Sequence, residues 1–138
     1  MSATREVIQP RNPALNVSKN LKLPHSPGIK CGDFIFLSGM VSVDPTTGQR
    51  KLGTTDSETR QILENMAHML ESAGSSLARV VKINVLLTRA SDVAPMNALY
   101  ASAFGPAPYP ARTTCVVQAL PDPKMLIEIE AVASLAGR

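Results

Sequence analysis

The C-terminal segment of the chain, residues 126–134, alternates between two different kinds of face. One face carries small or branched apolar side chains, namely Ile127, Ile129, Ala131 and Ala133. The other face mixes apolar with acidic side chains, namely Leu126, Glu128, Glu130 and Val132. Alternation with a period of two residues is typical of a β-strand that buries one face. The segment therefore predicts a strand that packs under helices on one side and leaves the other side neither clearly apolar nor clearly polar.

Two segments with helical spacing can cover that buried face. The first begins at a Thr55-x-x-Glu58 capping-box pattern and ends at Gly74, which suits the position after a helix terminus. Its apolar stripe consists of Ile62, Met66, Met69, Leu70 and Ala73. The second lies between Pro95 and Gly105, and its stripe consists of Met96, Leu99, Tyr100 and Ala103. We predict one helix in each segment.

Three further apolar runs predict strands at about 33–38, 79–88 and 112–120, with a turn at 44–48. The chain of 138 residues is too short for a TIM barrel or for a cofactor domain joined to a substrate domain. We therefore predict a single domain over residues 1–138, of the α+β class, with a single mixed β-sheet and two helices on one face. Residues 1–30 are rich in Pro, Asn and Lys, and residues 1–20 are expected to form an extended N-terminal arm.

Two helices can cover only one face of such a sheet. On the predicted register, the uncovered face holds several apolar side chains: Val116, Leu120, Leu126 and Val132. A small monomer seldom leaves so much contiguous apolar surface in water. We therefore expect a homo-oligomer that buries this face.

Composition argues against several functional classes. The formal net charge is only +3, the basic residues are scattered, and aromatic residues make up 4% of the chain, so a nucleic-acid-binding surface is not expected. No apolar run approaches the roughly 20 residues of a membrane span, and the N-terminus lacks a signal-peptide core, so a cytoplasmic protein without membrane contact is expected. Cys31 and Cys115 form no CxxC motif, and His25 and His68 have no partner at metal-ligand spacing. We expect no metal and no cofactor.

Five residues are candidates for a functional site. Arg112 stands at the start of a predicted strand and has the shape to bind a carboxylate, while Glu128 lies on the next strand in the sequence, where the two side chains could meet. The alternative is a structural Arg–Glu pair. Ser38-Gly39 could bring backbone close to a ligand or simply form a bulge. His25 could transfer protons or be an ordinary solvated loop residue.

Taken together, several motifs are more specific than any one of these positions. From residue 20 to residue 134, the sequence resembles the RidA family, also called the YjgF or L-PSP endoribonuclease family. The resemblance rests on the following pieces: Ser38-Gly39, Asp44-Pro45…Gly48, Asn65…Leu70…Ala73-Gly74, Val80-Val81-Lys82, Asn97…Tyr100…Phe104, Pro110-Ala111-Arg112 and Ile127-Glu128-Ile129-Glu130-Ala131.

The resemblance implies a chorismate-mutase-like fold, a homotrimer with clefts between subunits, and hydrolytic deamination of reactive enamines and imines to 2-oxo acids and ammonia. It implies that Arg112 binds the carboxylate of a small carboxylate-bearing substrate, that Glu128 positions the attacking water, and that Asn97 lies near the cleft. Ser38 and Gly39 would offer backbone contacts. The alternative is a non-catalytic module that binds 2-oxo acids in the same cleft. A ribonuclease is not favoured, because the chain lacks paired histidines and a basic aromatic surface.

Three positions depart from the family pattern. His25 replaces a tyrosine that would line the cleft, Met40 replaces the glutamine that commonly follows Ser-Gly, and Thr114 replaces a frequent cysteine. One residue is also inserted between Leu120 and Glu128. We expect these changes to leave the Arg and Glu in place and to reshape the wall of the substrate pocket.

Overall fold

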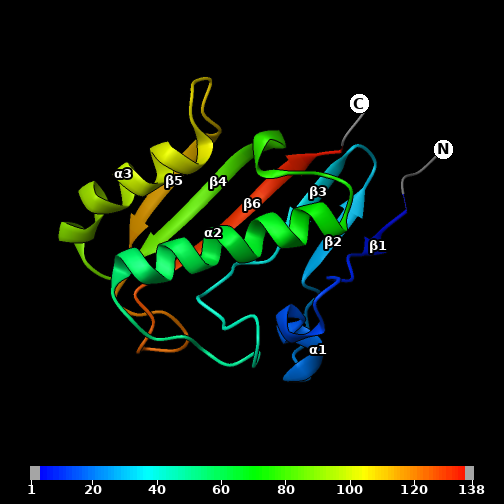
Figure 1. The fold of residues 1–138 in the computed structure, drawn as a ribbon, viewed down its shortest axis with the longest axis horizontal. Coiled ribbons are helices and arrows are strands. Elements are labelled where there is room, and N and C mark those ends of the chain that lie inside the picture. Colours follow the sequence, from blue (N-terminus) through cyan, green and yellow to red (C-terminus); the bar gives the residue numbers. More distant parts are fainter. Residues whose placement is uncertain (1–3, 136–138) are drawn as a thin grey trace.

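The computed structural model describes residues 4–135, which build one six-stranded sheet with the long helices α2 and α3 against one of its faces (Figure 1). The strand order is β1-β2-β3-β6-β4-β5, with β4 and β5 parallel and the other neighbours antiparallel. The predicted α+β class with a single mixed sheet is confirmed. In chain order the elements are β1 (Glu6–Val7), η1 (Pro13–Leu15), α1 (Val17–Asn20), β2 (Gly28–Cys31), β3 (Phe34–Leu37), α2 (Thr55–Ser72), η2 (Leu77–Arg79), β4 (Val80–Leu87), η3 (Ala90–Asp92), α3 (Val93–Phe104), β5 (Ala111–Val116) and β6 (Ile127–Ser134).

The expected extended arm over residues 1–20 is wrong for residues 13–20, which form the single turn η1 and the short helix α1. Residues 4–10 contain only the short strand β1, and residues 1–3 lie outside the described residues. Two asparagines start these turns, because the Asn12 side chain accepts a hydrogen bond from the Ala14 amide and the Asn16 side chain accepts one from the Lys19 amide. Elements this short depend on contacts with the rest of the fold rather than on their own propensity, which explains why sequence periodicity missed them.

Helix α2 begins one residue earlier than the capping pattern predicted. Thr54 is the N-cap, and it exchanges hydrogen bonds with Ser57, so the predicted Thr55–Glu58 box is wrong. Both Thr55 and Glu58 instead point into the protein, where they bind other elements. The end of the helix agrees with the prediction, since Gly74 has a φ of +85°, a conformation that favours glycine.

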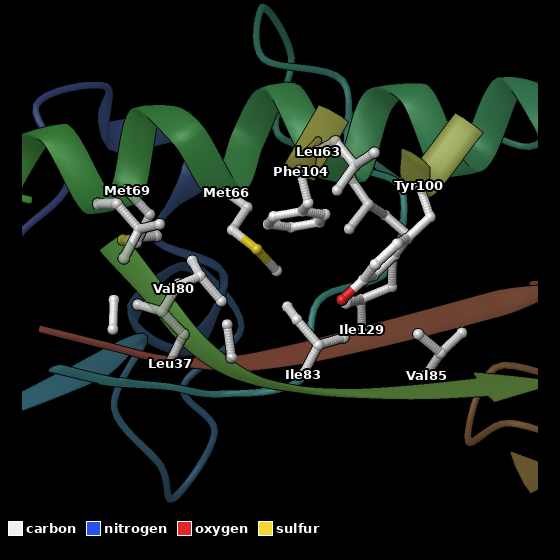
Figure 2. Packing of buried hydrophobic residues seen from close by; sticks show 14 of the residues in the cluster. Leu37, Leu63, Met66, Met69, Val80, Ile83, Val85, Tyr100, Phe104 and Ile129 are labelled. Atoms are coloured by element: carbon white, nitrogen blue, oxygen red, sulfur yellow. The ribbon is translucent and has the colours of Figure 1, made fainter. Parts of the chain in front are cut away.

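The main core lies between the two long helices and the sheet (Figure 2). Met66 of α2 and Phe104 of α3 face strand residues such as Ile83, and all three side chains are buried. Ile83, Val85 and Leu87 alternate on this face of β4 as predicted. Val81 does not join them, because a register shift between Val80 and Lys82 turns Val80 inward and leaves Val81 exposed.

The opposite face of the sheet carries exposed apolar side chains, although not all of the predicted ones. Phe34 and Phe36 are 43% and 48% exposed, and Phe36 pairs directly with Val132. The placement of Val116 and Leu120 on this face is wrong. Val116 pairs with Leu87 and so shares the helix-covered side, and Leu120 lies beyond the end of β5, where it is buried. Within residues 4–135, no helix combines the length and apolar character needed to cross a membrane.

Candidate functional site

A cavity of about 210 Å³ lies where the chain leaves β3 and passes beside β6. Four segments line it: residues 15–27 of the N-terminal region, the 38–50 loop, the middle of α2, and residues 121–128. Five of the residues that the sequence singled out are in its wall, namely His25, Ser38, Gly39, Met40 and Glu128. The structure therefore brings together residues that are separated by up to about a hundred positions in the chain.

The loop after β3 is held tightly beside Glu128. The Met40 amide donates to the Ile129 carbonyl at 2.8 Å, and the Ile129 amide donates back to the Met40 carbonyl at 3.0 Å. These two bonds bring Gly39 so close to Glu128 that a β-carbon at Gly39 would lie 2.6 Å from Glu128 Oε2. Glycine is needed here for this close approach, and its backbone is exposed to whatever the Glu128 carboxyl binds.

The Glu128 carboxyl lies in an environment that favours its protonated form. Burial raises its pKa above the usual range of a glutamate, and the negative charge of Glu130 raises the pKa further. The positive charge of Arg50 acts in the opposite direction. A carboxylate with a raised pKa is a stronger base than an ordinary glutamate, which suits it to accept a proton from water.

Arg50 and Asp122 are cavity residues that sequence reasoning missed. Both line the cavity, and Arg50 Nε lies 4.0 Å from Asp122 Oδ2. Arg50 follows the 44–48 turn without any motif of its own, so no sequence pattern marked it. For Asp122 there was a signal, because it stands in the segment between Leu120 and Glu128 that contains the inserted residue.

His25 is held in the cavity wall through its Nδ1 atom. Ser18 Oγ lies 2.9 Å from this nitrogen, and both residues line the cavity. Ser38 is also fixed, since its hydroxyl donates to the Ser26 carbonyl at 2.6 Å. The Ser38 side chain is therefore engaged within the protein, and its neighbour Gly39 offers the free backbone at this point.

The other three predicted site residues, Arg112, Asn97 and Thr114, do not line this cavity. The Arg112 guanidinium lies 4.7 Å from the centre of the Tyr100 ring, a cation–π contact at the edge formed by β5 and α3. Asn97 lies on α3 one turn before Tyr100 and is exposed. Thr114 follows Arg112 on the same side of β5 and is half-buried.

The expectation that Arg112 and Glu128 meet across neighbouring strands is wrong within one chain. Strand β4 lies between β5 and β6, so the two backbones are about 10 Å apart. Arg112 pairs with Ile83 on the helix-covered side, whereas Glu128 pairs with Leu86 on the opposite side. A site that uses both side chains must therefore take them from two copies of the chain.

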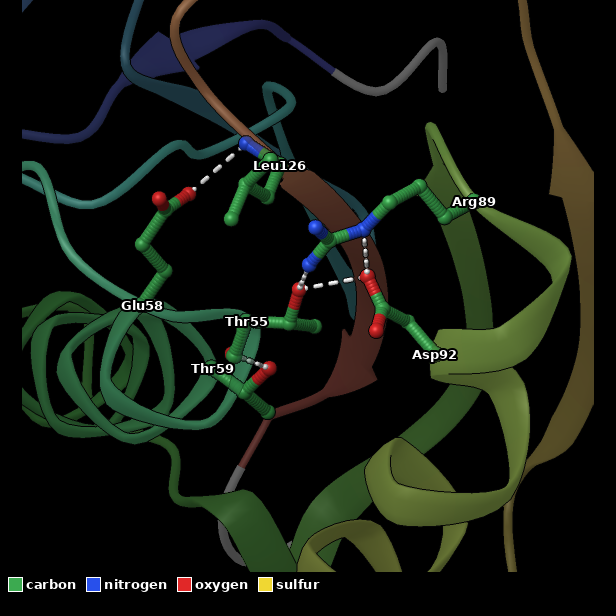
Figure 3. Close-up of polar contacts among 6 residues, drawn as sticks. All are labelled: Thr55, Glu58, Thr59, Arg89, Asp92 and Leu126. Atoms are coloured by element: carbon green, nitrogen blue, oxygen red, sulfur yellow. Dashed lines mark hydrogen bonds and ion pairs between the residues drawn. The ribbon is translucent and has the colours of Figure 1, made fainter.

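Polar contacts join α2 to the residue before β6 and to η3 (Figure 3). Glu58 is 0% exposed, and its Oε1 accepts a hydrogen bond from the Leu126 amide at 2.9 Å. Thr55 donates to Asp92 at 2.6 Å, and Arg89 donates to the same carboxylate at 2.8 Å. The Thr55 hydroxyl, assisted by Arg89, lowers the pKa of Asp92. Glu58 thus fixes the backbone two residues before Glu128.

The cavity offers two carboxylates, a guanidinium and an imidazole to a ligand, in a lining that is otherwise largely apolar. Across residues 4–135, no three His, Cys, Asp or Glu side chains gather in a way that could hold a metal ion. This lining fits a small organic molecule with a few polar groups.

Residues 18–135 match the sequence model of a family described as Endoribonuclease L-PSP. The chain belongs to this family, which is the RidA family of the sequence resemblance. A RutC family protein of Pyrococcus horikoshii is 46% identical over 110 residues, which are 80% of this chain and 86% of that protein. A human protein named 2-iminobutanoate/2-iminopropanoate deaminase is 38% identical, over 80% of this chain and 79% of its own length.

Solved L-PSP/RidA structures share the fold. A Rid family protein of Yersinia pestis has a TM-score of 0.85 and 30% identity, covering 96% of this chain and 100% of its own. Reactive Intermediate Deaminase A of Arabidopsis thaliana, a sequence relative, is 39% identical over 81% of this chain and 59% of its own length. Relatives of this L-PSP/RidA chain thus include proteins named as deaminases and others named only for the family.

Proposed function

We propose that this protein hydrolyses reactive 2-imino acids, and the enamines in equilibrium with them, to 2-oxo acids and ammonia. The observation that carries the proposal is the Glu128 carboxyl, which lies in the cavity wall against the bare backbone of Gly39 and has a raised pKa. The names of the human and Arabidopsis relatives support the same class of reaction.

The chemistry needs few groups, because the carbon of a protonated imine is already electrophilic. Glu128 accepts a proton from a water molecule while the water oxygen adds to the imine carbon. The proton then passes to the nitrogen of the tetrahedral carbinolamine. The C–N bond breaks as Glu128 takes the proton of the new hydroxyl and passes it to the departing ammonia, so that ammonium and the 2-oxo acid leave. One water molecule is consumed, and the Glu128 carboxylate returns to its starting state.

The substrate carboxylate needs a cation, and we assign this role to Arg112 of a neighbouring copy. One face of the Arg112 guanidinium rests on Tyr100, and no described residue of its own chain forms a salt bridge with it. The exposed Phe34 and Phe36 supply an apolar surface on which copies can associate. The proposed assembly is a homotrimer, in which Asn97 and Thr114 reach the cleft together with Arg112.

The test measures imine hydrolysis directly. An amino-acid oxidase generates the imine in the presence of semicarbazide, and a deaminase lowers the initial rate of semicarbazone formation. We expect Glu128→Gln to lower the deaminase rate by about 100-fold or more, and Arg112→Ala to abolish it. The matched controls are Glu64→Gln and Arg60→Ala, which change exposed residues of α2 and should retain the native rate.

Native rates in Glu128→Gln or in Arg112→Ala would refute the assigned roles. Binding of 2-oxo acids without any imine hydrolysis would instead favour the non-catalytic module. Sedimentation of the native protein tests the assembly, since a monomer at micromolar concentration contradicts a shared site.

A further inference from the structure

We propose that residues 8–18, called here the N-terminal segment, form the specificity wall of the candidate site and select imines with an extended apolar side chain. The inference rests on the proposed function and deepens it. The N-terminal segment was expected to be part of an extended arm. All of it except Ser18 precedes residues 18–135, the region that matches the family model.

The N-terminal segment contributes side chains directly to the cavity that contains Glu128. Leu15, Val17 and Ser18 all line it. Leu15 is only 5% exposed, yet it is not part of the main core between the helices and the sheet. It lines the cavity, so a ligand in the cavity meets Leu15 as part of the wall.

The remaining lining extends this apolar surface. Met40, Val41 and Val43 come from the loop after β3, and Met69 comes from α2. A substrate whose imine carbon lies at Glu128 therefore has hydrocarbon on several sides for its own side chain. Burying each additional methylene of the substrate in such a lining favours binding.

The N-terminal segment is held in a fixed position, as a specificity wall must be. The Asn12 amide donates to His68 Nε2 of α2 at 2.9 Å, and the Asn12 side chain donates to the Pro45 carbonyl at 2.8 Å. The Ile8 amide donates to the Gly28 carbonyl at 3.0 Å. At Gly48 the contact with this segment is so close that a β-carbon would lie 2.9 Å from the Ala14 carbonyl oxygen.

Position in the family supports a role in specificity rather than in the shared chemistry. The Pyrococcus and human relatives align with only 80% of this chain. The Yersinia pestis structure covers 96% of this chain, so the unmatched residues are too few to include the whole N-terminal segment. At least part of the N-terminal segment therefore has a counterpart in that structure, while Glu128 and Arg112 lie inside the region that matches the family model.

The experiment compares two imines, one generated from alanine and one from leucine, by the ratio of their kcat/KM values. The native protein should prefer the leucine-derived imine. Leu15→Ala removes three carbons from the wall and should lower this preference by about 10-fold or more. Val17→Phe narrows the cavity and should slow the leucine-derived imine more than the alanine-derived one. Leu21→Ala is the matched control, because Leu21 is 56% exposed and does not line the cavity.

An unchanged leucine-to-alanine ratio in both Leu15→Ala and Val17→Phe would overturn the inference. Thermal unfolding shows whether each variant folds. If one does not, the leucine-to-alanine ratio of the other variant decides the test. If the native protein hydrolyses neither imine, the proposed function fails, and calorimetric binding of the products pyruvate and 4-methyl-2-oxopentanoate to the same variants tests the wall. The inference is upheld if the preference for binding the larger acid falls by about 10-fold in the variants, and it is overturned if that preference is unchanged.

Discussion

Glu58 offers the sharpest test of how this fold is held together around its candidate site. Its carboxyl is fully buried, with Oε1 bonded to the Leu126 amide and Oε2 bonded to no residue within the described range 4–135. Burial raises the pKa of Glu58, against the opposing effect of the amides of Leu126, Gly53 and Ile127. The perturbations are Glu58→Gln, which removes the charge and keeps an acceptor, and Glu58→Ala, which removes both.

The two substitutions should act in opposite directions at neutral pH. Glu58→Ala leaves the buried Leu126 amide without an acceptor, which costs about 1–3 kcal/mol. It also removes one buried methylene group, worth about 0.8 kcal/mol. We therefore expect a loss of about 2–4 kcal/mol in the free energy of unfolding. Glu58→Gln keeps the shape and removes the cost of burying a charge, so it should equal or exceed the native protein in stability.

The pH dependence of the folding stability shows in which direction the Glu58 charge acts. Because the pKa of Glu58 is raised by folding, its contribution to stability is fully present below the ordinary pKa of a glutamate. That contribution is lost as the pH rises through the raised pKa of the folded state. Over that range, native stability should fall relative to Glu58→Gln by up to about 1.4 kcal/mol per pH unit.

Urea denaturation from pH 4 to pH 8 measures these differences. Taking the difference between the native protein and Glu58→Gln cancels the other titrating groups, including Glu128. Parallel stability curves for the two proteins across this range would refute the reasoning, since they would show that the buried carboxyl carries no electrostatic penalty. A loss below 1 kcal/mol in Glu58→Ala would show that the Leu126 amide does not depend on it.

Three further predictions follow from the site and the core. Gly39→Ala pushes the flexible end of Glu128 away, so turnover should fall by about 100-fold with little change in the unfolding midpoint, and native turnover would contradict the close approach. Arg50→Ala removes the charge that lowers the pKa of Glu128, so the acidic limb of the pH–rate profile should move to higher pH, and an unmoved limb would count against Arg50. Met66→Ala, at a fully buried position, should cost about 2–5 kcal/mol in urea denaturation, whereas Met66→Leu should cost less than about 1.5 kcal/mol.

Sequence periodicity located the elements that are specified by residues close together in the sequence. Helix α2 ends just before Gly74 as predicted, and β6 alternates as predicted, because each pattern spans several turns or pairs of residues. The N-terminal segment could not be predicted in this way. It is held by bonds such as that from Asn12 to His68, which joins positions 56 residues apart.

The candidate site was predictable in its components and not in its arrangement. His25, Gly39 and Glu128 gather at one cavity, in agreement with the residues that the sequence singled out. From sequence order alone, we expected the strands of Arg112 and Glu128 to be neighbours. The sequence does not show that β4 lies between them. Arg50 escaped notice, since a single arginine after a turn has no pattern and gains meaning only from the charges that the fold brings near it.

The separation of Arg112 and Glu128 on opposite faces of the sheet has a genetic consequence. Under the proposed assembly, each site takes its glutamate from one chain and its arginine from another. Two inactive variants, Arg112→Ala and Glu128→Gln, then carry complementary defects. Random co-assembly in equal amounts would rebuild about one quarter of the sites with both native groups. Two damaged copies of the gene could thus sustain, in one cell, an activity that neither provides alone.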